Sequence, residues 1–208
     1  MRIEHLAAKP DRAGRFSVRF DDGSSMRLYR QTVEDFGLYA GLELEEDRLE
    51  QLRSAAGQMS AKMRAVRIVT ASSVSKQDLR QRLIRKGEDP RQAEDAVAWM
   101  EELQLVDDRQ TAQQIVRSCA ARGYGLARAK QALYEKRIPK EYWQEVLEDY
   151  PDQSEKILEF LRSRLTADAD QRERKRAMDA LLRRGHSYGD IRQALGQLDM
   201  EFPEEYDG

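Results

Sequence analysis

Hydrophobic residues recur at helical spacing from about residue 60 to the C-terminal region. Relative to Leu83, apolar side chains lie four residues before, one after, and ten, fourteen and seventeen after. The nearer offsets mark one face of a helix, and the farther ones mark one face of a second helix. The same offsets around Leu133 and Leu181 are also apolar. The three sets are Leu79, Leu83, Ile84, Ala93, Val97 and Met100; Ala129, Leu133, Tyr134, Trp143, Leu147 and Tyr150; and Ala177, Leu181, Leu182, Ile191, Leu195 and Leu198. The pattern predicts a helix pair repeated three times.

A turn signal separates the two helices of each pair. The three corners read RKGEDP (85–90), EKRIPK (135–140) and RRGHSY (183–188). In the first corner, Gly87 can end a helix in the left-handed conformation, and Asp89-Pro90 can begin the next. Ser187 is a predicted N-cap in the third corner. Arg137 stands where a glycine is favoured, so we expect the second corner to be reshaped.

A further helix is predicted before each pair, at 61–72, 109–122 and 154–165. Asp107-Asp108 is interpreted as an N-cap followed by a favourable first-turn charge. The repeat of about 50 residues is typical of helical arrays, whose small units are stable only when stacked. We therefore expect a mainly α protein, an elongated array of tandem three-helix, helix-turn-helix-like repeats. The predicted repeats are 59–106, 107–150 and 151–200.

The N-terminal region has a different pattern. RFSVRF (15–20) and SMRLYR (25–30) alternate polar and apolar residues around a DDGS turn, which predicts a β-hairpin that MRIEHL can join as a third strand. Thr32 is a predicted N-cap for a short helix through Tyr39, which Gly41 would end. A charged helix is expected at 43–58. Residues 1–58 thus form a hairpin plus helices, and 201–208 form an acidic tail.

Charge and cysteine content restrict the class of protein. The 208 residues include 36 Lys plus Arg and 38 Asp plus Glu, so any attraction to nucleic acid must come from a local patch. The single cysteine, Cys119, allows no intramolecular disulfide and fits a reducing cytoplasm. The charge-free runs are too short for a membrane helix. We expect a cytoplasmic protein without membrane contact.

Catalytic motifs are missing from the sequence. There is no Walker-type loop, and the GYG at 123–125 is interpreted as a turn between helices. Cys119 is expected to be a buried small residue, and His186 to belong to the third corner. No nucleophile, base and orienting group come together in the pattern. The sequence therefore predicts a non-enzyme with no cofactor and no metal site.

Basic residues gather in the second and third repeats, where between 162 and 184 they outnumber acids two to one. The candidate contact residues are Arg122, Tyr124, Arg128, Lys130, Lys136, Arg137, Arg172, Arg174, Lys175, Arg176, Arg183 and Arg184. Such a face can track phosphates, or it can be a solvated helix surface with pairs four residues apart. The sequence leaves both readings open.

Two segments resemble the RecX family of bacterial regulatory proteins: LQLVDDRQTA (103–112) and YGLARAKQALYEKRIPKE (124–141). KQDLRQRLIRKG (76–87) fits the corresponding helix of the first repeat. Residues that match the family pattern are Leu103, Leu105, Val106, Asp107, Asp108, Ala112, Leu133, Lys136 and Ile138. Gln104 and Arg137 replace glycines, and Thr111 replaces an aromatic residue.

The resemblance implies a modulator of the RecA recombinase. Family members are understood to bind in the groove of the RecA–DNA filament and to dampen strand exchange, ATP hydrolysis and self-cleavage of the SOS repressor. By resemblance, we expect a monomer that binds RecA or the filament, inhibits it, and makes at most weak direct DNA contact. The alternative is a helix-turn-helix-like protein that binds DNA directly, which the basic third repeat favours. A scaffold of helical repeats with another protein partner is a third reading.

Overall fold

The computed structural model describes residues 1–166 and 168–200, and it divides into two compact units, Met1–Val106 and Asp107–Gly208. Each of the four hydrophobic clusters of described residues lies within one unit. The break between the units falls at the predicted start of the second repeat. The predicted acidic tail, 201–208, lies outside the described residues.

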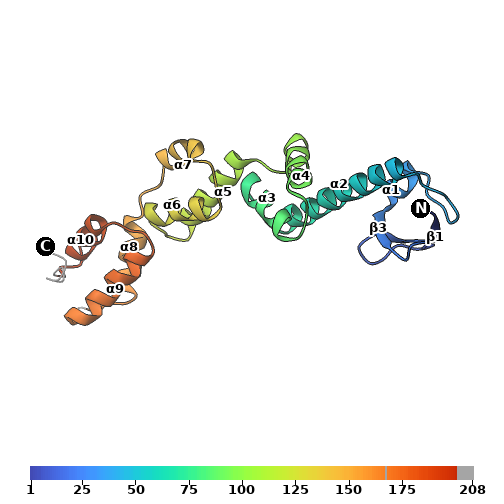
Figure 1. Cartoon of the computed structure of the whole chain (residues 1–208). Helices are drawn as coiled ribbons and strands as arrows, with labels where there is room; N and C mark the ends of the chain where they lie inside the picture. The colour runs from blue at the N-terminus through green and yellow to red at the C-terminus, as the bar shows by residue number, and fades with distance from the viewer. Residues whose placement is uncertain (167, 201–208) are drawn as a thin grey trace. The chain divides into compact units, whose positions relative to one another are not determined.

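The first unit begins with a small sheet, in which Figure 1 labels β1 and β3. The sheet has three antiparallel strands in the order β1-β2-β3. The strands are β1 (Ile3–Leu6), β2 (Arg15–Phe20) and β3 (Ser25–Tyr29). The predicted hairpin and its third strand are confirmed. Alternation places Val18, Phe20 and Leu28 on the buried face, where they pack with Leu49 and Leu52.

The short helix after the sheet differs from the prediction. Helix α1 (Arg30–Asp35) follows β3 without a loop, so it begins before Thr32, which is buried inside it and is not an N-cap. The helix also ends earlier than expected. The chain turns at Gly37, whose φ is +57°, well before Gly41.

Helix α2 (Glu46–Ala71) is one continuous helix of 26 residues. The two separate helices predicted at 43–58 and 61–72 are therefore wrong, and residue 58 lies inside α2. Gly57 does not interrupt the helix: a Cβ there would lie 2.4 Å from the Gln92 side chain, so the glycine allows close packing against the next helices. The first half of α2 packs on the sheet, and Ala61 and Ala65 belong to the first bundle.

The first bundle comprises the second half of α2, α3 (Lys76–Arg85) and α4 (Pro90–Glu102). Its corner is as predicted: Gly87 has a φ of +89°, Asp89 accepts from the Arg91 and Gln92 amides, and Pro90 opens α4. Glu88 is buried in the corner and pairs with Arg64 of α2. The corner is thus held to α2 by an ion pair.

The second bundle comprises α5 (Asp108–Ala121), α6 (Leu126–Glu135), a 3₁₀ turn η1 (Lys140–Tyr142) and α7 (Trp143–Glu148). Asp107 caps α5 as predicted, and Leu133 is fully buried. Tyr134, predicted on the buried face, is instead 72% exposed. Helix α7 has only six residues where α4 has 13, so it covers less of α6. Arg137 has a φ of +55°, so the second corner keeps the conformation of the first and the expected reshaping is wrong.

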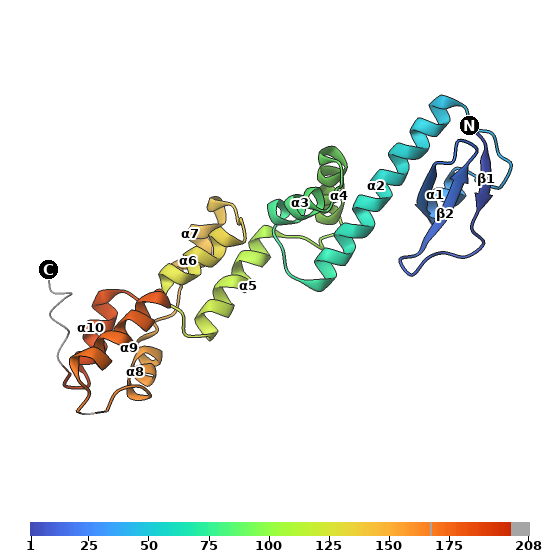
Figure 2. The same cartoon turned by 60° about the horizontal axis from the view of Figure 1, so that its bottom comes forward.

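The third bundle comprises α8 (Ser154–Arg162), α9 (Gln171–Arg183) and α10 (Tyr188–Gly196) (Figure 2). Capping boxes begin both later helices: Asp170 with Glu173 in α9, and Ser187 with Asp190 in α10. The three tandem bundles and the mainly helical fold are therefore confirmed.

Candidate interaction surfaces

Candidate reactive groups are sparse in this chain. Within the described ranges, no three His, Cys, Asp or Glu side chains gather in an arrangement that could hold a metal ion. Cys119 is 7% exposed, as predicted, and burial raises the pKa of its thiol. Among the helices that the structure describes, none has the length and apolar character needed to cross a bilayer. The candidate interaction surfaces are formed by the charged side chains of the three bundles.

Charge is divided between the helices of each bundle. The second helices are basic when their corner residues are included: α3 with Lys86 carries five bases and one acid, α6 with Lys136 and Arg137 carries four and one, and α9 with Arg184 carries six and two. The third helices are not. Helix α4 has one base and four acids, η1 with α7 has one base and three acids, and α10 is balanced.

This division bears on DNA reading by a helix-turn-helix unit. Helix-turn-helix units place their last helix in the major groove of DNA, where the nucleobases lie between two rows of negatively charged phosphates. Helices α4 and α7 are acidic, so inserting either helix into the groove would bring its carboxylates close to the negatively charged phosphates. A third-helix reading mode is therefore electrostatically unfavourable in the first two bundles.

In the first bundle, two of the five bases of α3 and its corner pair with acids of α4. Lys76 Nζ lies 2.8 Å from a Glu101 carboxylate oxygen, and Arg80 Nε lies 4.0 Å from Glu94. Both acids belong to α4. The basic character of α3 therefore contributes to helix pairing and leaves less charge for a partner.

The predicted contact residues of the second bundle divide into supporting and open side chains. Tyr124 is half-buried and its carbonyl accepts a hydrogen bond from the Tyr150 hydroxyl at 2.6 Å. Arg128 Nη1 lies 3.0 Å from Glu135 Oε1. By contrast, the side chains that are exposed and make no ion pair with another described residue are Arg122, Lys130 and Arg137. Lys136 is half-buried at the end of α6.

Helix α9 presents a stripe of arginines. Arg172, Arg176 and Arg183 are exposed, and their spacing of four and seven residues puts them on one face. Arg174 and Lys175 are half-buried beside the bundle core. Arg184, just after the helix, lies with its guanidinium 4.6 Å from the centre of the Phe160 ring.

The second and third bundles meet through two glycines. A Cβ on Gly125 would lie 2.0 Å from the Gly185 carbonyl oxygen, so neither backbone leaves room for a side chain. The Gly125 amide donates to the Arg184 carbonyl at 2.9 Å. We call this contact the junction. It is the feature that sequence reasoning missed, because GYG was interpreted as an ordinary turn.

Two side chains reinforce the junction. His186 Nε2 lies 3.0 Å from the Gly123 carbonyl oxygen, and burial lowers the pKa of this imidazole. Lys156 Nζ donates to the Ala120 and Ala121 carbonyls at 2.9 Å, where the α5 dipole favours a cation. The junction brings Arg122 and Arg184, 62 positions apart in the sequence, to the rim of one depression.

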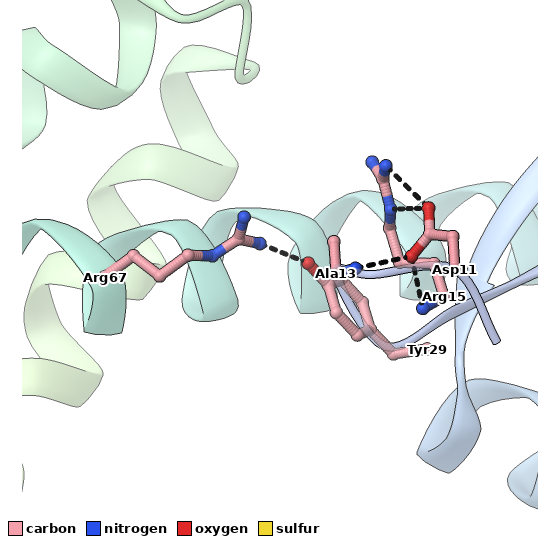
Figure 3. A network of polar contacts seen from close by, with 5 residues as sticks. All are labelled: Asp11, Ala13, Arg15, Tyr29 and Arg67. Atoms are coloured by element: carbon pink, nitrogen blue, oxygen red, sulfur yellow. Dashed lines mark hydrogen bonds and ion pairs between the residues drawn. The ribbon is translucent and has the colours of Figure 1, made fainter.

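A polar network in the N-terminal sheet is structural (Figure 3). Asp11 Oδ1 accepts from the amides of Ala13 and Arg15, and Oδ2 accepts from the Arg15 guanidinium at 2.8 Å. The Arg15 backbone hydrogen bond is the main reason that the pKa of Asp11 lies below its ordinary value. Arg67 of α2 donates to the Tyr29 hydroxyl. These contacts hold the loop before β2 and join α2 to the sheet.

Known proteins resemble this chain in both sequence and fold. The model of the second three-helix domain of RecX matches residues 107–147. The chain is 31% identical to the regulatory protein RecX of Halorhodospira halophila (strain DSM 244 / SL1) over 152 residues, 70% of this chain and 94% of that protein.

Two solved structures have the same fold. A crystal structure of regulatory protein RecX superposes with a TM-score of 0.63 at 19% identity, covering 95% of this chain and 98% of that one. RecX from Lactobacillus salivarius gives a TM-score of 0.59 at 21% identity, covering 70% and 98%. The three-helix bundles, their corners and the extent of the sequence match agree: the chain belongs to the RecX family.

Proposed function

We propose that this chain is a regulatory protein that binds RecA or the RecA–DNA filament and inhibits its recombinase, ATPase and SOS coprotease activities, with no reaction of its own. Membership of the RecX family supports this role, since the relatives are named as regulatory proteins. The observation that carries the proposal further is the set of open bases in the second unit, which includes the segment matched by the family model.

The contact surface that we propose lies at the end of α5 and along the second helices, α6 and α9, of the second unit. It consists of Arg122, Lys130, Arg137, Arg172, Arg176 and Arg183. A filament of protein and DNA presents carboxylates and phosphates, which complement these bases. Modest contacts spread over two bundles add up through effective concentration, without a deep pocket. A monomer in the cytoplasm, where RecA and the chromosome are found, fits this role.

The test is RecA ATPase activity on single-stranded DNA with increasing amounts of the chain. We expect inhibition below one chain per RecA protomer, as for a protein that acts on filaments. The triple variant Arg122→Glu/Lys130→Glu/Arg137→Glu should need at least about tenfold more protein for the same inhibition, a loss of about 1.4 kcal/mol or more.

A matched control carries the same charge change on other elements. Arg117→Glu/Lys140→Glu/Arg162→Glu alters exposed bases of α5, η1 and α8. It should inhibit like the unmodified chain, and thermal unfolding should show that both variants are folded. No inhibition by the unmodified chain would refute the function; equal inhibition by both variants would refute only the surface.

A second candidate function is direct binding of DNA through the phosphate backbone. The arginine stripe of α9 favours it, whereas the acidic α4 and α7 oppose groove reading. Such binding is sequence-independent and weakens steeply with salt. Gel retardation of duplex DNA without RecA, lost in Arg172→Glu/Arg176→Glu/Arg183→Glu, would support it, and no retardation at low salt would exclude it.

A further inference from the structure

A surface depression lies beside the junction, within the second unit. Its volume is about 380 Å³, within the range of about 300–1,000 Å³ of small-molecule sites. The charged, polar and aromatic side chains that line it are those of Arg122, Lys156, Glu159, Phe160, Ser163 and Arg184. A carboxylate or a lone phosphate would fill only part of this space. The depression has the size for a larger ligand.

The lining is cationic. The lining contains three basic side chains but only one carboxylate, that of Glu159. The basic residues are Arg122 at the end of α5, Lys156 of α8 and Arg184 of the third corner. Arg122 and Arg184 make no ion pair with a carboxylate in the part of the chain that the structure describes. Lys156 uses two of its three N–H groups on α5 carbonyls, so one remains for a ligand. The depression favours an anionic group.

An aromatic ring and planar guanidinium groups lie side by side at this site. The guanidinium of Arg184 lies 4.6 Å from the Phe160 ring centre, and that of Arg164 lies 5.4 Å from it. Nucleobases stack on aromatic rings and on guanidinium planes. A carboxylate side chain bound here would pair with the basic groups but would not stack on the ring and guanidinium planes. A nucleotide would pair through its phosphate and stack through its base.

The site is preorganised by the junction. The contact of Gly125 with Gly185, the hydrogen bond of His186 to Gly123 and the two bonds of Lys156 all fix the elements that line it. Little ordering is therefore needed when a ligand binds, and this preserves affinity.

We propose that this depression binds a nucleotide unit. The phosphate lies against Arg122 and Lys156, and the base stacks on the Arg184–Phe160 pair. The nucleotide can belong to a single strand or be free in solution, since both offer the same phosphate and base. RecA is not needed for this binding, so the proposal is separate from the regulatory function.

The experiment measures binding to the full chain, without RecA, by fluorescence anisotropy of a labelled ten-residue deoxythymidine strand. ADP and inorganic tripolyphosphate are used as competitors. Strong competition by ADP would identify a free nucleotide as sufficient, and weak competition would identify the strand; both outcomes support a nucleotide site. If ADP competes strongly, displacement by tripolyphosphate at the same concentration would show that the base contributes nothing, which would overturn the proposal.

Two variants test the two halves of the site. Arg122→Gln removes an exposed charge and should weaken binding of the strand, ADP and tripolyphosphate. Phe160→Leu should weaken binding of the strand and ADP about fivefold or more, because stacking is lost, and should leave tripolyphosphate unchanged. Arg117→Gln, also exposed on α5, is the matched control and should bind like the unmodified chain.

Two results would overturn the proposal. If Arg122→Gln binds the strand as tightly as the control, the depression is not the site, even if Phe160→Leu fails to fold. If a labelled octaglutamate peptide binds as tightly and shows the same loss in Arg122→Gln, the surface takes an acidic protein segment and the nucleotide assignment is wrong.

Discussion

At the scale of single residues, the corners show that packing can impose a glycine-like conformation. Arg137, in the second corner, has a φ of +55°, and Gln104, in the turn after α4, has a φ of +56°. After α6, the Arg137 amide donates to Tyr134 and the Ile138 amide donates to Leu133, the same pair of bonds that Gly87 and Glu88 make after α3. Ile138 is buried, so its hydrophobic contact selects the corner even though the preceding residue is strained.

That strain leads to a stability prediction. The left-handed conformation costs a non-glycine residue about 1–2 kcal/mol, and the extra unfolded-state freedom of glycine offsets part of this. Arg137→Gly should therefore raise the free energy of unfolding by up to about 1 kcal/mol, measured by urea unfolding. Gly87→Ala, at the same place in the first corner, should lower it by about 1 kcal/mol. A less stable Arg137→Gly variant would show that the arginine side chain stabilises the corner.

His186 predicts a pH dependence of stability. Its ring faces the Gly123 carbonyl, Asp190 and Arg184, and burial is the main cause of its lowered pKa. Because the unfolded chain binds this proton at a higher pH than the folded chain, stability is highest above about pH 6.5 and falls as the pH drops below it.

The measurement is the thermal unfolding midpoint between pH 7.5 and pH 5. His186→Gln keeps a donor for Gly123 and has no titrating ring, so its midpoint should vary less with pH than that of the unmodified chain. His5→Gln, at an exposed position, is the control and should change nothing. An identical pH profile for His186→Gln and the unmodified chain would show that His186 does not couple folding to pH.

At the scale of elements, the repeated helix pairs depend on their anchors. Leu83, Leu133 and Leu181 are all fully buried. Leu133→Ala should lower the free energy of unfolding by about 2–5 kcal/mol, because it removes apolar contacts and leaves a cavity. Chemical denaturation checks this, and Leu126→Ala, at a site 41% exposed, should cost much less. Similar losses for the two variants would mean that the anchor site collapses around the change.

The junction is the other element-scale feature that can be tested. Gly125→Ala places a methyl group 2.0 Å from the Gly185 carbonyl, so the two bundles must separate. Hydrogen exchange should increase at the Gly125 and Ala127 amides, which donate to Arg184 and Gly185. Gly196→Ala, with open space around it in α10, should leave these amides protected. Unchanged protection in Gly125→Ala would show that the bundles adjust without parting.

At the scale of the whole molecule, the two units have independent cores. The second unit contains its own two hydrophobic clusters. A fragment of residues 107–208 should therefore unfold cooperatively by itself, with a midpoint close to that of the same transition in the full chain. Circular dichroism melting tests this. A broad, non-cooperative melt of the fragment would mean that the second unit depends on the first.

Sequence reasoning succeeded where the information is local. The apolar offsets predicted the buried faces around Leu83 and Leu181, and the capping residues Asp89, Asp107 and Ser187 predicted helix starts. It failed where it divided α2 between residues 58 and 61, and it failed at Tyr134. The packing of Gly57 against Gln92 and the shortness of α7 involve residues distant in the sequence. For the same reason, it could not separate the open Arg122 from the paired Arg128.

The sequence by itself determined the helix pairs, their corners and the resemblance to the RecX family, because periodicity and capping depend on residues within a few positions of each other. Only the tertiary structure decided which bases are open and which support the fold. Exposure and pairing depend on neighbours far along the chain, such as Gly185 against Gly125 and Lys156 at the end of α5. The depression between Arg122 and Arg184 exists only because those distant segments meet.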